Sequence, residues 1–143
     1  MVNEKLQIVG GVTYNEAEQK FAEKIYATLQ EPYLPLGSES VMQPYEVIQD
    51  YGSTDVGDVS VTVPTVGLNT ATFVPGTFLH SWQAVATGGM SIGYKGAHVA
   101  SKVLALTAIE LFENPELRKA AREEFEQRRG NDFIYKPLLG DRE

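Results

Sequence analysis

Residues 59–73, VSVTVPTVGLNTATF, decide which fold class the sequence predicts. The opening residues alternate valine with serine or threonine, which is typical of a β-strand with one buried face. Pro64 ends this run, and a second β-prone run from Val66 to Phe73 follows it. The dipeptide Pro75-Gly76 favours a turn and closes the second run. We therefore predict two strands, at residues 59–63 and 66–73.

Helical periodicity flanks the predicted strands on both sides. Before them, Asn15 and Glu18 match a capping box, and apolar residues then recur every three or four positions. After them comes a long apolar stretch that we expect to be a largely buried helix, and Asn114-Pro115 then starts a charged helix. We predict helices at about residues 16–29, 91–113 and 115–129, and an ordered loop with a short helical turn within residues 31–51.

The order of the predicted elements favours an α/β fold. It lacks the regular alternation of strands and helices that a doubly wound fold shows. Two or three strands do not make an extensive sheet alone, so the pattern predicts part of an α/β domain whose other strands lie elsewhere. We expect a single domain over residues 1–143, in which residues 1–12 form a short apolar strand or an incoming connection broken by Gly10-Gly11.

The composition limits the classes of partner. The chain has 43% apolar and 22% charged residues, as in an ordinary globular protein. No apolar run approaches the roughly 20 residues of a membrane span, and the net charge of −7 disfavours nucleic acid. The absence of cysteine excludes disulfides and thiolate metal ligands. We therefore expect a cytoplasmic protein with neither a membrane nor a nucleic acid as its partner.

Polar residues that could form a site fall in two places. Gly52, Ser53, Thr54 and Asp55, with Asp58 close behind, form a glycine-framed turn, and His80 lies in the next loop. The two carboxylates could bind a metal ion, orient a ligand, or bond to their own backbone as Asx-turns. A lone loop histidine is more often a structural residue than a ligand. The residue types alone therefore favour the structural interpretation of both places.

The second histidine and the serines give weaker indications of a functional site. His98 lies within the predicted buried helix, where we expect it to be a packed residue. The sequence contains no Gly-x-Ser-x-Gly elbow and no phosphate-binding glycine loop, so neither serine-nucleophile nor nucleotide chemistry is indicated.

Several motifs are specific when their order and spacing are taken together. They occupy residues 51–60, 64–65, 75–77, 80–83 and 95–96. In these motifs the chain resembles the C-terminal part of amidohydrolases of the di-metal exopeptidase superfamily, which includes aminoacylase and carboxypeptidase G. Within it, the resemblance is to the branch of the p-aminobenzoyl-glutamate hydrolase B subunit.

This resemblance implies a fold, a cofactor and site residues. It implies the C-terminal portion of a mixed-sheet α/β catalytic domain with two C-terminal helices, in which residues 1–12 connect from a lid domain. The family binds two divalent ions, zinc or manganese, and a glutamate base activates the bridging water. His80 matches the last metal ligand, and Gly52, Ser53, Thr54 and Asp55 match the loop that holds the carboxylate end of the substrate. The place of Asp58 stays open.

The other metal ligands of the family are missing from this sequence. Neither its His-x-Asp motif nor its Glu-Glu pair before the carboxylate turn occurs, and the only histidines are His80 and His98. A stable zinc site needs three or four protein ligands, so we expect the chain alone to bind zinc weakly or not at all and to be inactive. It is then a truncated or split C-terminal piece of the hydrolase, or a domain excised from it.

Three hypotheses for function remain. The first is a C-terminal segment of a metal-dependent amidohydrolase that cleaves a small carboxylate-bearing amide, such as an N-acyl or aminobenzoyl amino acid. The second is a non-catalytic partner or regulatory remnant that associates but binds no metal. The third is a generic ligand-binding domain for which the resemblance misleads. Unpaired strands also predict a homo-oligomer, or association with the missing N-terminal part, unless the N-terminal helix covers the gap and the chain is a monomer.

Overall fold

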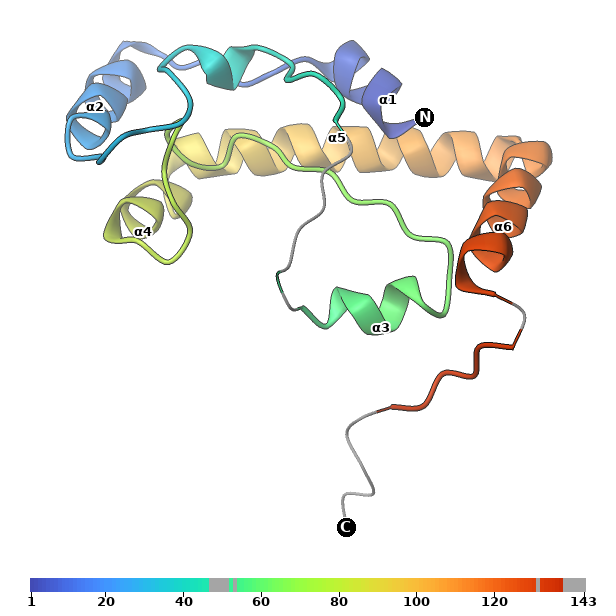
Figure 1. The fold of residues 1–143 in the computed structure, drawn as a ribbon. Helices are drawn as coiled ribbons and strands as arrows, with labels where there is room; N and C mark the ends of the chain where they lie inside the picture. Colours follow the sequence, from blue (N-terminus) through green and yellow to red (C-terminus); the bar gives the residue numbers. More distant parts are fainter. Residues whose placement is uncertain (47–51, 53, 131, 138–143) are drawn as a thin grey trace. The chain divides into compact units, whose positions relative to one another are not determined.

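A computed structural model describes residues 1–46, 52, 54–130 and 132–137. Within these ranges every regular element is a helix (Figure 1). The predicted mixed-sheet α/β fold is therefore wrong for the described part of the chain. The elements are α1 (Val2–Val9), α2 (Glu16–Tyr26), the 3₁₀ turn η1 (Ser38–Ser40), α3 (Val56–Ser60), α4 (Trp82–Gly88), α5 (Ser91–Glu113) and α6 (Pro115–Arg129).

The chain divides into two compact units. The first comprises Met1–Tyr45 and Leu68–Ala108, and the second comprises Glu46–Gly67 and Ile109–Glu143. The first unit therefore contains α1, α2, η1, α4 and most of α5, and the second contains α3, α6 and the last turn of α5.

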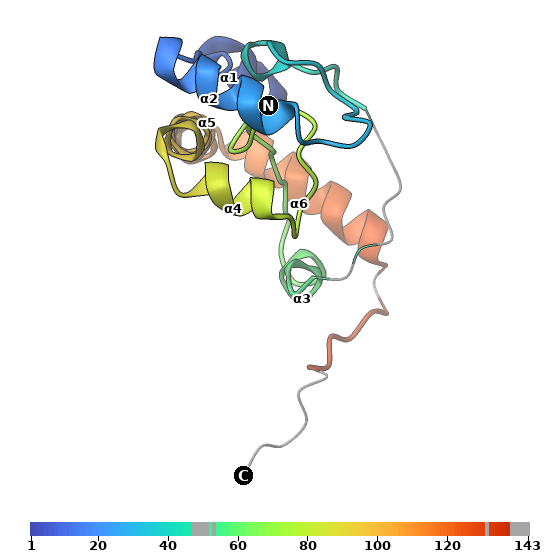
Figure 2. The same ribbon diagram turned by 90° about the vertical axis from the view of Figure 1, so that its left-hand side faces the viewer.

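The core of the first unit forms where α2, the Val74 segment and the start of α5 meet. Ala22, Ile25, Val74 and Ile92 are its buried members. Figure 2 shows α2 and α4 on neighbouring sides of α5. The predicted capping box starts α2: Asn15 Oδ1 accepts from the Glu18 N–H at 2.9 Å, and the Glu18 carboxylate accepts from the Asn15 N–H at 2.7 Å. The helix predicted at residues 16–29 is thus confirmed, with its end at Tyr26.

The second predicted strand is extended chain that lies against α5. Its backbone reaches α5 at Gly96, where a Cβ would come within 2.3 Å of the Ala71 carbonyl oxygen. Only glycine permits this approach of backbone to helix without displacement. Residues 66–73 form no strand in the structure, and Val66 is exposed.

The first predicted strand begins in the last two residues of α3 and continues as a turn. Residues 56–60 form α3, and the valines at 59 and 63 are half-exposed. Hydroxyl groups that alternate with them bond back to backbone carbonyls of the preceding turn: Ser60 Oγ to Gly57 O at 3.0 Å, and Thr62 Oγ1 to Val59 O at 2.8 Å. The hydroxyl groups of Ser60 and Thr62 therefore bond to carbonyl groups of their own turn. No described strand lies beside them.

The bounds of the two C-terminal helices are confirmed, but the burial of α5 is not. α5 spans Ser91–Glu113 and α6 spans Pro115–Arg129, with Asn114 Oδ1 accepting from the Leu117 N–H at 3.0 Å. We expected α5 to be largely buried, yet Phe112 is 84% exposed and Leu104 and Ile109 are also exposed. Its buried residues are Ile92, Gly93, Gly96, Val103 and Thr107.

Two further elements differ from the prediction. Residues 2–9 form the helix α1 and not a short strand, and its C-cap Gly10 has a φ of 81°. The helix α4 was not predicted, because we read residues 77–88 as a loop. The short helical turn expected within residues 31–51 is η1, at Ser38–Ser40. No helix in the described ranges is both long and apolar enough to span a lipid bilayer.

The second unit has one buried aromatic residue on α6. The guanidinium groups of Arg122 and Arg129 lie 5.3 and 4.7 Å from the centre of the Phe125 ring. Cations at this distance are attracted by the faces of an aromatic ring. Among the residues of α6, Phe125 is the one that the structure buries.

Candidate functional site

His80 lies at a turn of the first unit immediately before α4. Its φ is 61°, in the left-handed region that residues other than glycine adopt rarely. Ser81 holds both sides of this turn, since its Oγ accepts from the Ala84 N–H at 3.2 Å and donates to the Phe78 carbonyl at 2.7 Å. The imidazole of His80 is exposed. A left-handed non-glycine residue costs free energy, and such residues concentrate at functional sites.

A shallow groove borders this turn. Its walls are Phe78, Ser81, Trp82, Gln83 and residues 28–31. The Gln83 side-chain amide donates to the Thr28 carbonyl and hydroxyl oxygens at 3.4 and 3.3 Å, which ties α4 to the end of α2. Glu31 in the groove wall has a φ of 48°. The non-glycine residues with positive φ among the described residues, Glu31 and His80, thus belong to one region of the surface.

The predicted carboxylate turn lies in the second unit. Asp55 is the N-cap of α3, but its side chain accepts no capping hydrogen bond from the helix. Its Oδ1 accepts instead from the Thr54 hydroxyl at 3.3 Å. Gly52 is exposed, and Ser53 lies outside the described residues. Both aspartate side chains of the turn therefore remain accessible to a ligand.

Asp58 has a specific neighbour in the same unit. Desolvation raises the pKa of Tyr135, and the nearby Asp58 carboxylate raises it further. This neighbour belongs to the chain that follows α6. The Asp58 side chain is exposed, so its carboxylate is still able to accept a hydrogen bond from a ligand.

The predicted site residues do not all come from one unit. His80 belongs to the first unit, whereas Gly52, Thr54, Asp55 and Asp58 belong to the second. Within the described residues, no three or more histidine and carboxylate side chains gather as a metal site requires. The donors that this part of the chain brings together do not fit a complete zinc site. The metal role of His80 and the substrate role of the carboxylate turn stay predictions.

Sequence reasoning did not find the most strongly perturbed carboxylate. Glu18 is 3% exposed, and its carboxylate lies 2.5 Å from Lys95 Nζ, which also donates to the Thr13 carbonyl at 2.8 Å. Burial disfavours ionisation of Glu18, but the bonds from Lys95 and from the Asn15 N–H outweigh it and lower the pKa to about 2. The capping box located Glu18, yet nothing local in the sequence indicates its partner.

A tyrosine beside this pair is also perturbed. Burial raises the pKa of Tyr14 above its usual range, and the nearby carboxylates of Glu39 and Glu18 raise it further. Tyr14 therefore remains a neutral phenol at physiological pH, and the Glu18–Lys95 pair contributes fixed charges around it.

Part of the chain matches a known protein. It is 41% identical over 75 residues to the B subunit of the p-aminobenzoyl-glutamate hydrolase of Escherichia coli (strain K12). The chain is related to that protein. The match covers 52% of this chain and only 16% of the length of the relative. No protein-family profile and no solved structure matches the chain. The predicted relation to this branch is confirmed, and membership of the wider di-metal exopeptidase superfamily stays a prediction.

Proposed function

We propose that the chain forms part of a metal-dependent amidohydrolase that cleaves an amide bond of an N-acyl or aminobenzoyl amino acid by metal-activated water. The observation that carries this proposal is the 41% identity over 75 residues to a component of p-aminobenzoyl-glutamate hydrolase. Identity at this level over a continuous segment favours descent from a common hydrolase. The accessible carboxylate turn and the exposed His80 support a role for this chain near a site.

His80 is the residue that we assign to the metal in this proposal. A neutral imidazole suits zinc, and the Ser81 bonds to Phe78 and Ala84 fix the backbone on which it stands. The left-handed φ of 61° supports a functional reason for histidine at this position, because glycine would be less strained there. His98, on the exposed surface of α5, lacks such features.

In this proposal, the residues that hold the carboxylate end of the substrate are Gly52, Ser53, Thr54 and Asp55. Thr54 contributes a hydroxyl that can donate to a carboxylate, and its Oγ1 already lies 3.3 Å from one oxygen of Asp55. The place of Asp58 stays open in this proposal. The remaining metal ligands and the general base come from outside this chain, so the chain alone has no hydrolase activity.

Association follows from this assignment. The relative is named as one subunit of its hydrolase, and we propose that this chain likewise functions with a partner that supplies the missing ligands. One of the two arguments for a homo-oligomer rested on unpaired strands, which the described residues do not contain, and the other rested on the apolar surface of the helix α5. The exposed apolar side chains of Phe112, Ile109 and Leu104 on α5 support the second argument.

A chimera tests the proposal. In the E. coli hydrolase, the segment aligned with this chain is replaced by this chain, and hydrolysis of p-aminobenzoyl-glutamate is measured with zinc or manganese supplied. We expect a hydrolytically active chimera, with a loss of at least about 100-fold and a lower metal content in the His80→Ala variant. His98→Ala is the matched control, since it removes the other histidine from an exposed helical position.

Two results would contradict the proposal. A chimera that folds and binds metal but hydrolyses no amide would support the non-catalytic alternative. Equal metal content and activity in the His80→Ala and His98→Ala variants would remove His80 from the metal site.

A further inference from the structure

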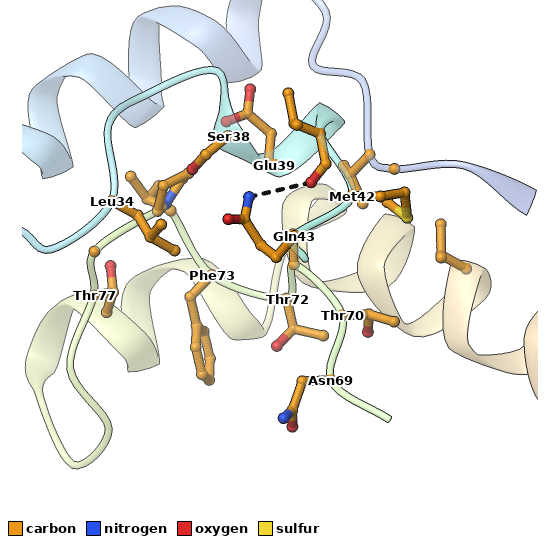
Figure 3. A pocket seen from close by; sticks show the side chains of 18 of the residues that line it. Leu34, Ser38, Glu39, Met42, Gln43, Asn69, Thr70, Thr72, Phe73 and Thr77 are labelled. Carbon is orange, nitrogen blue, oxygen red and sulfur yellow. Dashed lines mark hydrogen bonds between the residues drawn. The ribbon is translucent and has the colours of Figure 1, made fainter. Parts of the chain in front are cut away.

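The first unit contains a cavity that none of the predicted site residues lines. Its volume is about 270 Å³. Figure 3 shows Leu34 and Thr77 on one side, Glu39 and Ser38 above, and Phe73 and Thr72 below. Apolar side chains make up much of the wall. Small-molecule sites in proteins have this character, an apolar lining with a few polar groups that fix orientation.

Thr77 carries an unused hydrogen-bonding group in this wall. Its side chain is 6% exposed, and its Oγ1 has no hydrogen-bond partner. Buried polar groups without a partner are uncommon, and each one indicates a missing partner or a functional role. Another buried threonine shows the ordinary case, since Thr87 Oγ1 donates to the Gln83 carbonyl at 2.8 Å.

The backbone fixes Thr77 before any ligand is present. Its N–H donates to the Val74 carbonyl at 3.1 Å, which closes a turn through Gly76. Gly76 has a φ of 78°, and a Cβ there would lie 2.6 Å from Pro32 Cβ. The turn therefore packs directly on the loop after α2. A hydroxyl held in this way is pre-organised, and little entropy is lost when a ligand bonds to it.

The charge of the lining selects among ligands. Glu39 is the only charged residue among the described residues that line the cavity. Its side chain is 8% exposed, and its carboxylate accepts from the Gly37 N–H at 2.8 Å. A buried negative charge in the wall disfavours an anionic ligand beside it. The other polar side chains of the lining, among them Asn69, Thr72 and Gln43, are uncharged and suit a neutral molecule.

We propose that this cavity binds an uncharged small molecule with an aromatic or aliphatic body and one hydrogen-bonding group that pairs with the Thr77 hydroxyl. The body lies against Leu34 and Met42. This binding site goes beyond the proposed hydrolase function, and its residues are separate from His80 and from the carboxylate turn. A carboxylate-bearing substrate is the kind of ligand that the cavity disfavours.

The test uses the full chain and three simple probes followed by ¹H–¹⁵N NMR. Benzyl alcohol has the predicted body and a hydroxyl, toluene lacks the hydroxyl, and benzoate is an anion of similar size. We expect benzyl alcohol to shift the amide signals of Thr72, Phe73 and Thr77. Benzoate should bind at least about tenfold more weakly, because its charge must be buried beside Glu39.

Thr77→Val separates the hydroxyl from the rest of the cavity, because valine has nearly the same shape. The variant should bind benzyl alcohol about threefold to tenfold more weakly and toluene unchanged, as expected for one lost hydrogen bond. Two matched controls leave the affinity for both probes unchanged. Thr87→Val removes a buried hydroxyl that has a partner, and Thr107→Val removes one that has none but lies outside the cavity.

Stability measurements show whether a change in binding comes from altered folding of a variant. Since the Thr77 hydroxyl has no partner in the free protein, Thr77→Val should melt at or above the temperature of the parent, whereas Thr87→Val should melt below it. Benzyl alcohol should raise the melting temperature of the parent more than that of Thr77→Val.

Each of three results overturns the proposal. They are cavity amide signals that do not respond to benzyl alcohol, a Thr77→Val variant that binds it as tightly as the parent, and binding of benzoate as tight as that of benzyl alcohol. Cavity signals that shift only with protein concentration would show that a second copy of the chain is the occupant. None of these results depends on amide hydrolysis by the chimera.

Discussion

Replacing Gly96 with alanine should destabilise the first unit, because this glycine lies where the extended chain before Val74 meets α5. A Cβ at this position would lie 2.3 Å from the Ala71 carbonyl oxygen and 2.8 Å from the Thr72 nitrogen. Ordinary van der Waals contacts of a Cβ begin at 3.4 Å. Either the helix or the extended segment must therefore move by about 1 Å.

The magnitude follows from two opposing effects. Overpacking of this kind costs about 1–3 kcal/mol, and the upper end applies here because the obstructing atoms are backbone and not the end of a flexible side chain. Alanine in place of glycine favours the helix by about 1 kcal/mol. The net loss is about 2 kcal/mol, which lowers the melting temperature by about 6 °C in a chain of this length.

Thermal and urea unfolding followed by circular dichroism measure this change. Gly89→Ala is the matched control in the same unit, since a Cβ there meets nothing within 4 Å. Its φ of −89° is accessible to alanine, so its stability should be unchanged or slightly higher. A Gly96→Ala protein as stable as the parent would refute the contact between residues 71–72 and α5, and with it the described packing of the first unit.

Two further predictions concern charge and backbone strain. Because the pKa of Glu18 is about 2 in the folded state and 4.5 ordinarily, the parent has a stabilising contribution above pH 4.5 that is lost as the pH falls toward 2. Glu18→Gln should therefore be less stable than the parent at pH 7, and the difference should shrink between these values in urea unfolding; a difference independent of pH would contradict the Glu18–Lys95 pairing. His80→Gly should raise the free energy of unfolding by about 0.5–1 kcal/mol by relieving the left-handed backbone, while it abolishes hydrolysis by the chimera. A destabilised His80→Gly protein would show that the imidazole has a structural role.

Helices with local signals could be predicted from the sequence, because those signals act within one turn. Asn15 and Glu18 bond to each other's backbone as a capping box does, and Asn114 caps α6 as its position before Pro115 indicates. The same kind of signal was present for α4, whose N-cap is Ser81.

Strands and sites depend on partners far away in the sequence, and here the prediction was wrong or incomplete. Alternating valines predict a strand only if another strand lies beside them, and none is described. The Glu18–Lys95 pair joins residues 77 positions apart. The left-handed φ of His80 and the unpartnered hydroxyl of Thr77 likewise follow from tertiary packing, which no local pattern encodes.

The β-prone residues 59–63 lie in the end of α3 and in the turn after it, and this conflict between sequence preference and structure affects how the protein behaves when it is concentrated or heated. A short uncharged segment rich in valine is the type of sequence that seeds cross-β aggregates once its native structure opens. The flanking residues counter this tendency. Asp58 adds a negative charge before the segment, and Pro64 removes a backbone donor after it. These two residues therefore act as gatekeepers against aggregation.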